Sequence, residues 1–289
     1  SKNDIKSEKI YNLKKKGYFK ASEASKELVD LINENIINKN QIDNELTEKL
    51  HSNKAKTNSD EKKSISYKID TSIRQKILNF IQEDFKDDIS VLEKYYNNKI
   101  AVAEVQVKRN YPLDNKEYYN QKIRSKEFEY YSNYYHVDFY VNTHLKLFVN
   151  LQDVTKEDGP LHIYSKTSTG NFIKKNKYKN RNNYLANEIE TELYVNSSKK
   201  RESFFANTTE CLHRAGDLKN GHHRDMLFIS FIVIPEKVKN ENKSSIDFYN
   251  NIYPDSLWIH DSRVTKKTKP NSLKDVYSLF KNYYTSKIN

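Results

Sequence analysis

Apolar residues in the first hundred positions recur with a helical period. Within Ala21–Ile37 they lie one, three or four residues apart, at Leu28, Leu31, Ile32 and Ile36. This spacing is typical of one face of an amphipathic α-helix. It predicts helical structure over residues 8–50 and a further helix over Ile73–Phe85, with a polar, exposed loop at 51–65 between them. We expect residues 1–99 to form a helical N-terminal region that packs on the rest of the chain.

From Ile100 onward the apolar runs become short and β-branched residues dominate them. Such runs alternate with polar loops and no helical pattern intervenes, which is typical of an antiparallel barrel or jelly roll. We therefore predict a mainly β fold with helical decoration, whose core is a double-stranded β-helix (jelly roll, cupin-like) over residues 100–235. The clearest predicted strands are Ile100–Val107, Tyr135–Tyr140, Leu145–Leu151, Leu161–Tyr164, Ser203–Asn207 and Met226–Ile234.

The last part of the chain, residues 236–289, has a mixed pattern. It predicts a C-terminal extension with a closing helix around Ser272–Tyr284, and Trp258 is expected to anchor this extension on the barrel. The 289 residues are then organised as a single domain.

Composition narrows the class of protein. No apolar run approaches the ~20 residues that a membrane span needs, and Ser1–Lys20 is polar and lacks the apolar stretch of a secretory signal. The single cysteine, Cys211, excludes an internal disulfide and fits a reducing compartment. We therefore expect a cytoplasmic protein without a membrane span. The number of subunits is not indicated.

The formal net charge of +11 raises the question of a nucleic-acid partner. The excess is spread along the chain, with +3 in residues 1–100 (20 basic, 17 acidic) and +4 in residues 235–289 (10 basic, 6 acidic). Heavy use of Lys, Asn, Ile and Tyr beside scarce Gly, Pro, Met and Trp indicates an AT-rich coding genome. A solvated surface explains most of the charge, and no nucleic acid is expected.

Three residues form a candidate metal site. Side chains two apart in a strand point to the same face, so His136 and Asp138 would converge. With His213 they would offer two imidazoles and one carboxylate, the facial set of non-haem iron enzymes, which leaves open positions for co-substrate and oxygen. Taken alone, His136-Val137-Asp138 could also be a surface histidine beside the aspartate of a strand end.

Arg224, eleven residues after His213, opens an apolar run. Burying an arginine needs an anionic partner, and a bound dicarboxylate gripped by two hydrogen bonds would be one. If the strands that carry His213 and Arg224 are antiparallel neighbours joined by Gly216–His223, both side chains can face one cavity. The alternative is an internal salt bridge from Arg224 to Asp217 or Asp225.

With these motifs in order, Tyr135–Ile234 resembles the phytanoyl-CoA dioxygenase family of iron(II)/2-oxoglutarate oxygenases. The matching segments are His136–Phe139, Val149–Leu161 (with its Glu-Asp-Gly-Pro-Leu turn) and Leu212–Gly216 followed by Arg224. The resemblance covers about the C-terminal two-thirds of the chain and is absent from residues 20–95.

The resemblance implies that His136, Asp138 and His213 hold Fe(II), and that Arg224 binds the far carboxylate of 2-oxoglutarate. It implies a hydroxylase that consumes O2 and releases succinate and CO2. Asp138 favours hydroxylation over halogenation, because related halogenases lack this carboxylate.

Two positions depart from the family's pattern. The loop after the Gly-Pro turn reads Ser165–Ser168 instead of proline-glycine-serine-histidine, and Ala215 stands where a serine or threonine often touches 2-oxoglutarate. Gln106, Lys108 and Asn110, on one face of the first strand, are further candidates for binding the co-substrate.

The substrate is predicted to be small or carrier-linked, with an anionic group as one option. The basic stretch Phe172–Tyr184, expected in a loop beside the site, could attract a phosphate or carboxylate, or could simply be solvated. Two other classes stay open: a jelly-roll ligand-binding protein without turnover, and a basic nucleic-acid-binding module. Among other candidates, His144 and His162 are expected in the core or at a pocket edge, His222 and His223 in an exposed turn, and Cys211 as a small apolar group.

Overall fold

The structure is a computed structural model that describes residues 2–39, 64–98, 100–112, 135–138, 145–176 and 193–233. Helices dominate the N-terminal part of these residues and strands the remainder. The elements are α1 (Lys2–Lys16), β1 (Tyr18–Lys20), α2 (Lys26–Ile32), the π-helix η1 (Asn33–Asn38), β2 (Ser64–Ser66), α4 (Thr71–Asp84), α5 (Lys86–Tyr96), β3 (Ile100–Asn110), β4 (Leu145–Asn150), β5 (Leu161–Tyr164), α7 (Lys166–Asn176), β6 (Leu193–Val195), β7 (Ser203–Ala206), β8 (His213–Ala215) and β9 (Arg224–Val233).

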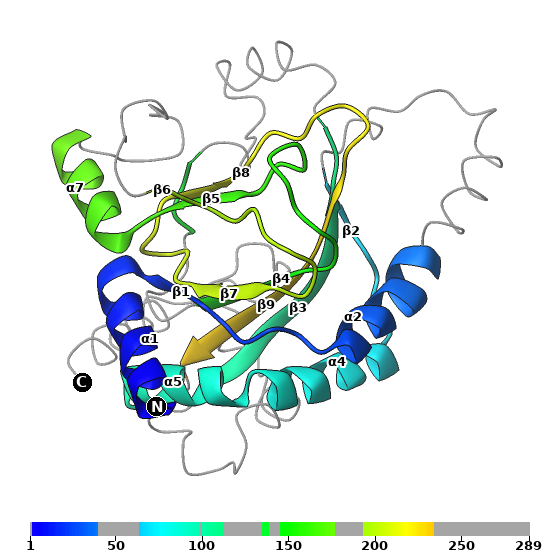
Figure 1. Cartoon of the computed structure of the whole chain (residues 1–289), viewed down its shortest axis with the longest axis horizontal. Helices are drawn as coiled ribbons and strands as arrows, with labels where there is room; N and C mark the ends of the chain where they lie inside the picture. Colours follow the sequence, from blue (N-terminus) through cyan, green and yellow to red (C-terminus); the bar gives the residue numbers. More distant parts are fainter. Residues whose placement is uncertain are drawn as a thin grey trace, which may run out of the picture.

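The strands form two antiparallel sheets, which lie one above the other in Figure 1. The larger has the order β1-β7-β4-β9-β3-β2 and the smaller the order β6-β5-β8. A bridge between His136 and His213 adds the segment 135–138 beside β8. From β3 onward the chain passes repeatedly from one sheet to the other, so that β9 returns between β3 and β4. This is the winding of a double-stranded β-helix, and the predicted jelly roll is confirmed.

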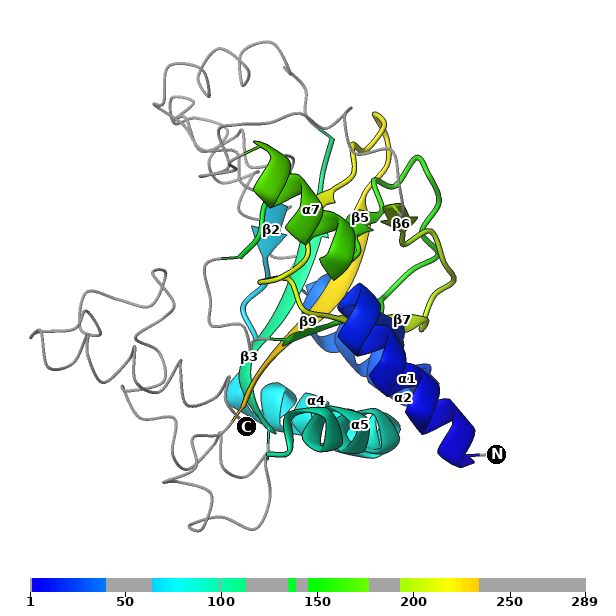
Figure 2. The ribbon, with the colours of Figure 1, turned by 90° about the vertical axis from the view of Figure 1, so that its left-hand side faces the viewer.

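The outer face of the large sheet packs against helices. Figures 1 and 2 show α4 and α5 lying across this face, with α1 and α2 beside them. Leu147 of β4 and Leu227 and Ile229 of β9 are fully buried in the same core as Ile77 and Ile81 of α4. Each such side chain stabilises the fold by roughly 1.5–3 kcal/mol.

The inner face points toward the small sheet. Phe148 of β4, Phe204 of β7 and Met226 of β9 form a second buried cluster with Leu161 and Ile163 of β5. The rings of Phe148 and Phe204 stack with their centroids 4.8 Å apart. Alternate residues of β4 and β9 therefore serve two cores, as the period of a strand requires.

The helical prediction for residues 8–50 was wrong in one place. Gly17, at φ +78°, ends α1, and the next three residues form the edge strand β1. Phe19 of β1 stacks on Phe205 of β7 with ring centroids 5.4 Å apart, so packing on the sheet outweighs local helical spacing. Residues 40–50 lie outside the described residues.

Most of the other predicted helices and strands that lie in the described residues are present. The helix at Ile73–Phe85 is α4, and five of the six predicted strands are present as β3, β4, β5, β7 and β9. Of the predicted strand Tyr135–Tyr140, residues 135–138 are described, and they form a single bridge at His136 in place of a regular strand. Ser64 and Ile65, the end of the predicted loop 51–65, belong instead to β2, which pairs with β3. Residues 51–63, Trp258 and Ser272–Tyr284 lie outside the described residues.

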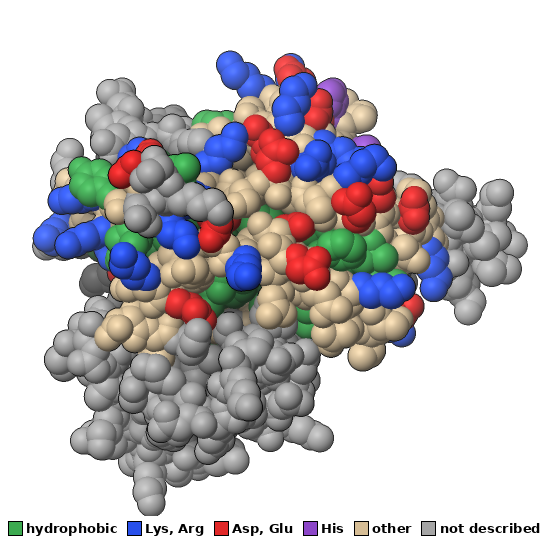
Figure 3. Space-filling view, turned by 60° about the horizontal axis from the view of Figure 1, so that its bottom comes forward, with side chains coloured by type: hydrophobic (Ala, Val, Ile, Leu, Met, Phe, Trp, Pro, Cys, Tyr) green, Lys and Arg blue, Asp and Glu red, His purple; other side chains and the backbone are tan. Residues whose placement is uncertain are grey.

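The described surface carries both signs of charge. In Figure 3, Lys and Arg side chains alternate with Asp and Glu over the helical face. Ion pairs join Lys6 to Asp87 at 3.1 Å and Lys20 to Glu202 at 2.8 Å. This mixture agrees with a solvated surface. No helix in the described part of the chain is long and apolar enough to cross a membrane.

The buried Asp88 links three N-terminal segments and provides a stability test. Its carboxylate accepts from Lys9 Nζ of α1 at 2.5 Å and from the Ser22 backbone N–H at 2.8 Å. We expect Asp88→Ala to lower the free energy of unfolding by roughly 2–4 kcal/mol in urea denaturation, because both donors lose their partner. The control Asp87→Ala removes an exposed neighbour and should change it by less than ~0.5 kcal/mol. Equal effects would contradict this role of Asp88.

Candidate metal centre

His136, Asp138 and His213 come together between the sheets. The two histidines form a reciprocal backbone pair, with N–H to carbonyl distances of 3.0 and 2.9 Å. Their Nε2 atoms lie 3.8 Å from Asp138, His136 facing Oδ1 and His213 facing Oδ2. One ligand atom from each side chain lies within 4.8 Å of the others, and all three residues are buried. Two imidazoles and one carboxylate at this separation can hold a divalent ion.

The backbone prepares these ligands for a metal. His213 Nδ1 lies 3.0 Å from the Cys211 carbonyl oxygen. A carbonyl only accepts, so Nδ1 carries a proton and Nε2 is the ring nitrogen that remains to bind a metal. Asp138 is held by its own backbone N–H, which donates to the Thr208 carbonyl at 2.9 Å. His213 and Asp138 are therefore held in place, and His213 keeps Nε2 available for a metal.

A residue that the sequence reasoning missed completes the centre. Lys146, near the start of β4, donates from Nζ to Asp138 Oδ2 at 2.5 Å. Burial by itself raises the pKa of the Asp138 carboxyl, but Lys146 and the two histidines hold that pKa well below its usual value. Asp138 is thus ionised at neutral pH. A lysine between the buried Leu145 and Leu147 was the available signal, because a charge at that position of an apolar strand needs a partner.

Arg224 is the first residue of β9 and is 2% exposed. It shares the inner face of the strand with Met226. Its Nε and Nη1 have no hydrogen-bond partner among the residues that the structure describes. Burial lowers the pKa of this guanidinium to about 10, and the Asp158 carboxylate opposes the shift. A buried arginine with idle donors is a site for an anion.

The alternative partners of Arg224 are otherwise engaged. Asp225 accepts two hydrogen bonds from Arg109, at 2.8 and 2.7 Å, and Asp217 lies 3.8 Å from Arg214. The predicted pairing of strands was wrong, however. The strand of His213, β8, belongs to the small sheet and β9 to the large one, because the chain between them crosses from sheet to sheet.

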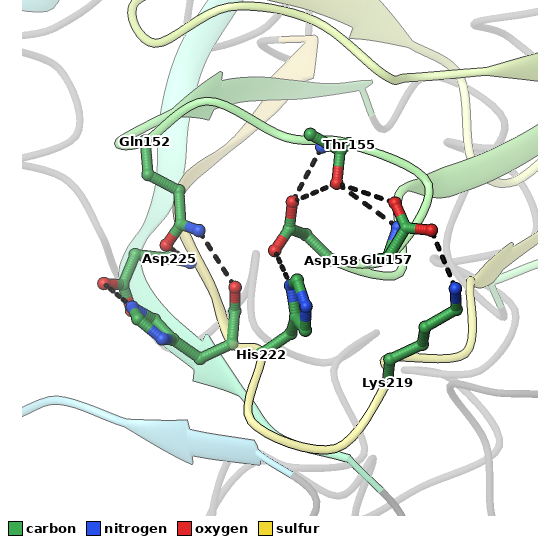
Figure 4. Close-up of polar contacts among 8 residues, drawn as sticks. Gln152, Thr155, Glu157, Asp158, Lys219, His222 and Asp225 are labelled. Atoms are coloured by element: carbon green, nitrogen blue, oxygen red, sulfur yellow. Dashed lines mark hydrogen bonds and ion pairs between the residues drawn. The ribbon is translucent and has the colours of Figure 1, made fainter.

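A polar network holds the turn that precedes Arg224 (Figure 4). Gln152 donates to the His223 carbonyl at 2.9 Å and accepts from the Asp225 N–H at 3.0 Å. Asp158 accepts from Thr155 and pairs with His222 Nδ1 at 2.9 Å. The exposed His222 is thus held by Asp158, and the backbone of the next residue, His223, is held by Gln152.

Glycine allows the two turns to approach. Gly159 has φ +59°, and a Cβ there would lie 2.6 Å from the Gly216 carbonyl oxygen. The Gly216 N–H in turn donates to the Pro160 carbonyl at 2.8 Å. The Gly-Pro turn noted in the sequence thus packs directly beneath the end of β8.

The weaker candidates for co-substrate binding lie on the inner side of β3. Gln106 and Lys108 stand opposite Phe228 and Met226, and Asn110 stands opposite Arg224. Gln106 donates to Glu104, and Lys108 Nζ lies 5.6 Å from the Phe228 ring centroid. Their role in binding stays a prediction.

The side chains of the other candidate residues have contacts outside the triad. Cys211 is buried with Sγ 3.4 Å from the Lys16 carbonyl of α1, and burial raises the pKa of its thiol. His162 lies beside Tyr135, and burial with the nearby Arg214 lowers its pKa to about 4. The basic stretch begins in a helix, since α7 runs to Asn176, and residues 177–184 lie outside the described residues, as does His144.

Comparisons with known proteins give structural likenesses only. No protein-family model and no curated protein matches the chain, so membership of the phytanoyl-CoA dioxygenase family stays a prediction. AviO1 from Streptomyces viridochromogenes Tue57 is 11% identical with a TM-score of 0.47, covering 80% of this chain and 96% of that one.

Two further solved structures are similar to the same extent. SnoN, a non-haem α-ketoglutarate-dependent epimerase from nogalamycin biosynthesis, is 11% identical with a TM-score of 0.48, over 80% of this chain and 84% of that one. HygX from Streptomyces hygroscopicus, with nickel and 2-oxoglutarate bound, is 12% identical with a TM-score of 0.47, over 78% and 86%. The fold and the candidate centre rest on the strand order and on the geometry of this chain's own residues.

The two buried arginines should respond oppositely to the same substitution. We expect Arg224→Met to raise the free energy of unfolding of the metal-free protein by about 1–3 kcal/mol, because it removes a buried charge whose Nε and Nη1 have no partner in the described part of the chain. Arg109→Met should lower it by about 3–5 kcal/mol, because it leaves Asp225 buried and unpaired. Urea denaturation at neutral pH measures both. A loss of stability in Arg224→Met would contradict an idle guanidinium.

Proposed function

We propose that this chain is an iron(II)- and 2-oxoglutarate-dependent dioxygenase that hydroxylates a small or carrier-linked substrate, with O2 consumed and succinate and CO2 released. One observation carries the proposal. A buried His-Asp-His set, with its ligand atoms within 4.8 Å, shares the interior of a jelly roll with a buried arginine whose Nε and Nη1 have no partner among the described residues.

The residues present fit such a metal. His136 and His213 would offer Nε2, and Asp138 one carboxylate oxygen, which is the facial set that leaves three positions for other ligands. When bound, iron(II) would supply the activation of oxygen that no protein side chain provides. The chain's own contribution is to hold the three ligands in a fixed tautomer and charge state and to keep them in a buried environment.

Arg224 would bind the far carboxylate of 2-oxoglutarate. Its guanidinium is fully charged at neutral pH even with a pKa of about 10. A carboxylate would take one of the idle donors, Nε or Nη1, together with Nη2 in a two-pronged pair of charge-assisted hydrogen bonds. Because Arg224 is rigid at the start of β9 and the turn before it is held by Gln152, the co-substrate would be oriented rather than merely attracted.

The nature of the oxidation follows from Asp138. In the family that the sequence resembles, loss of this carboxylate accompanies halogenation, so its presence supports hydroxylation. For the substrate, Lys108 on the inner face of β3 is a cation that an anionic group could meet.

Succinate formation tests the proposal. Protein loaded anaerobically with iron(II) and 2-oxoglutarate is exposed to oxygen, and succinate is quantified. We expect slow succinate formation without a substrate, and at least a ~100-fold loss in His213→Ala, which removes a ligand. The control His223→Ala removes a partly exposed imidazole and should behave as wild type.

The other outcomes identify the alternatives. Succinate formation that survives in His213→Ala would contradict the proposed centre. Binding of metal and 2-oxoglutarate without succinate, even in the presence of candidate substrates, would favour the ligand-binding protein. Failure to bind iron would remove the oxygenase proposal, and nucleic-acid affinity that falls steeply with salt would favour the third class.

The role of Arg224 can be separated from the metal. With Co(II) in place of iron, we expect Arg224→Met to raise the Kd of 2-oxoglutarate about 100-fold or more, because two charge-assisted hydrogen bonds are lost. The Kd of 2-oxoglutarate in Arg224→Lys should lie between the values of wild type and Arg224→Met, since lysine keeps the charge but not the two-pronged geometry. The Kd of Co(II), measured without 2-oxoglutarate, should not rise in either variant. Titration calorimetry measures both constants, and an unchanged Kd of 2-oxoglutarate would exclude Arg224 from its site.

A further inference from the structure

The ammonium group of Lys146 contacts the same carboxylate, Asp138, that would bind the metal ion in the proposed centre. Its Nζ lies 2.5 Å from Asp138 Oδ2, and the side chains are 17% and 9% exposed. Lys146 points inward from β4, opposite Ala206 of β7 and Ser230 of β9. The contact is therefore between the inner face of the large sheet and the segment that carries the ligands.

The two oxygens of Asp138 have different neighbours. Oδ1 lies 3.8 Å from His136 Nε2, whereas Oδ2 lies 3.8 Å from His213 Nε2 and is also the acceptor from Lys146. With Oδ2 engaged by an ammonium group, Oδ1 is the oxygen left for a metal. Lys146 thereby favours coordination through one oxygen, which keeps the other positions open for the co-substrate.

The same contact sets the charge of the centre. The charges of Asp138 and Lys146 cancel, and Arg224 adds a buried positive charge whose Nε and Nη1 have no hydrogen-bond partner among the described residues. A divalent ion would then share one carboxylate with Lys146. Repulsion between a divalent and a monovalent cation across one carboxylate is worth a factor of roughly ten in a binding constant even at the dielectric of water, and more in a buried site. A dianion such as 2-oxoglutarate would neutralise the excess positive charge of the metal ion, Lys146 and Arg224.

We propose that Lys146 couples the binding of the metal to the binding of the dianionic co-substrate, so that the ion binds weakly alone and tightly as a pair with 2-oxoglutarate. This inference rests on the proposed function. Lys146 acts here through Asp138 and is a positioning residue. By linkage, the factor by which 2-oxoglutarate tightens the metal is also the factor by which the metal tightens 2-oxoglutarate.

Titration calorimetry with Co(II), with and without saturating 2-oxoglutarate, tests the coupling. In wild type we expect 2-oxoglutarate to lower the Kd of Co(II) at least about tenfold. In Lys146→Met we expect Co(II) alone to bind about tenfold more tightly than in wild type, because the repelling charge is gone and Asp138 has lost its competing partner. In this variant 2-oxoglutarate should lower the Kd of Co(II) less than in wild type, by about the same factor. Part of the decrease remains, because 2-oxoglutarate still chelates the ion directly.

Two control variants separate charge from structure. Lys146→Arg keeps the positive charge and should keep the wild-type pattern. Lys199→Met removes a lysine of an exposed ion pair, 2.9 Å from Asp153, and should leave both constants unchanged. A merely structural role of Lys146 would weaken Co(II) binding in Lys146→Met, opposite to the expected direction. If Lys146→Met does not fold, the wild type and Lys146→Arg still test the proposal. It is overturned if 2-oxoglutarate fails to lower the Kd of Co(II) in either protein.

The outcomes distinguish this inference from the proposed function. Equal Co(II) affinity in wild type and Lys146→Met, with 2-oxoglutarate still bound, would overturn the role of Lys146 and leave the oxygenase proposal standing. Failure of the wild type to bind Co(II) at all would overturn both.

Discussion

The register of β9 is the constraint on which the rest of the structure depends. This strand pairs with β3 on one side and β4 on the other, and its alternate residues serve two different environments. Leu227, Ile229 and Phe231 belong to the core under the helices, while Met226 faces the small sheet. A slip of one residue would exchange the two sets, placing Arg224 among the helices.

One buried ion pair secures that register. Arg109 of β3 and Asp225 of β9 stand opposite each other and form two hydrogen bonds on the outer face. Because Asp225 points outward, its neighbour Arg224 must point inward. Gln152, bonded to the backbone on both sides of Arg224, adds a second restraint. The position of the guanidinium is thus set by the sheet, since its Nε and Nη1 have no partner among the residues that the structure describes.

The interior combines apolar packing with charges that the fold does not need. Phe148, Phe204 and Met226 pack the inner face, whereas the buried Asp138 and Arg224 and the partly buried Lys146 lie near it. Buried charges of this kind are weak evidence for stability and are more often kept for function. The larger apolar core lies on the helical side of the large sheet, and the smaller one lies on the side of these charges.

The sequence by itself determined the class of fold and the residue types of the centre, because strand alternation and the order of His136, Asp138, His213 and Arg224 are local properties of the chain. Five of its six predicted strands and α4 are present, but it missed β1, whose residues form a strand by pairing with the edge of β7. Only the tertiary structure decided that His213 and Arg224 lie on opposite sheets and that Lys146 contacts Asp138. These depend on how the chain crosses between sheets, and no local pattern encodes which inner faces meet.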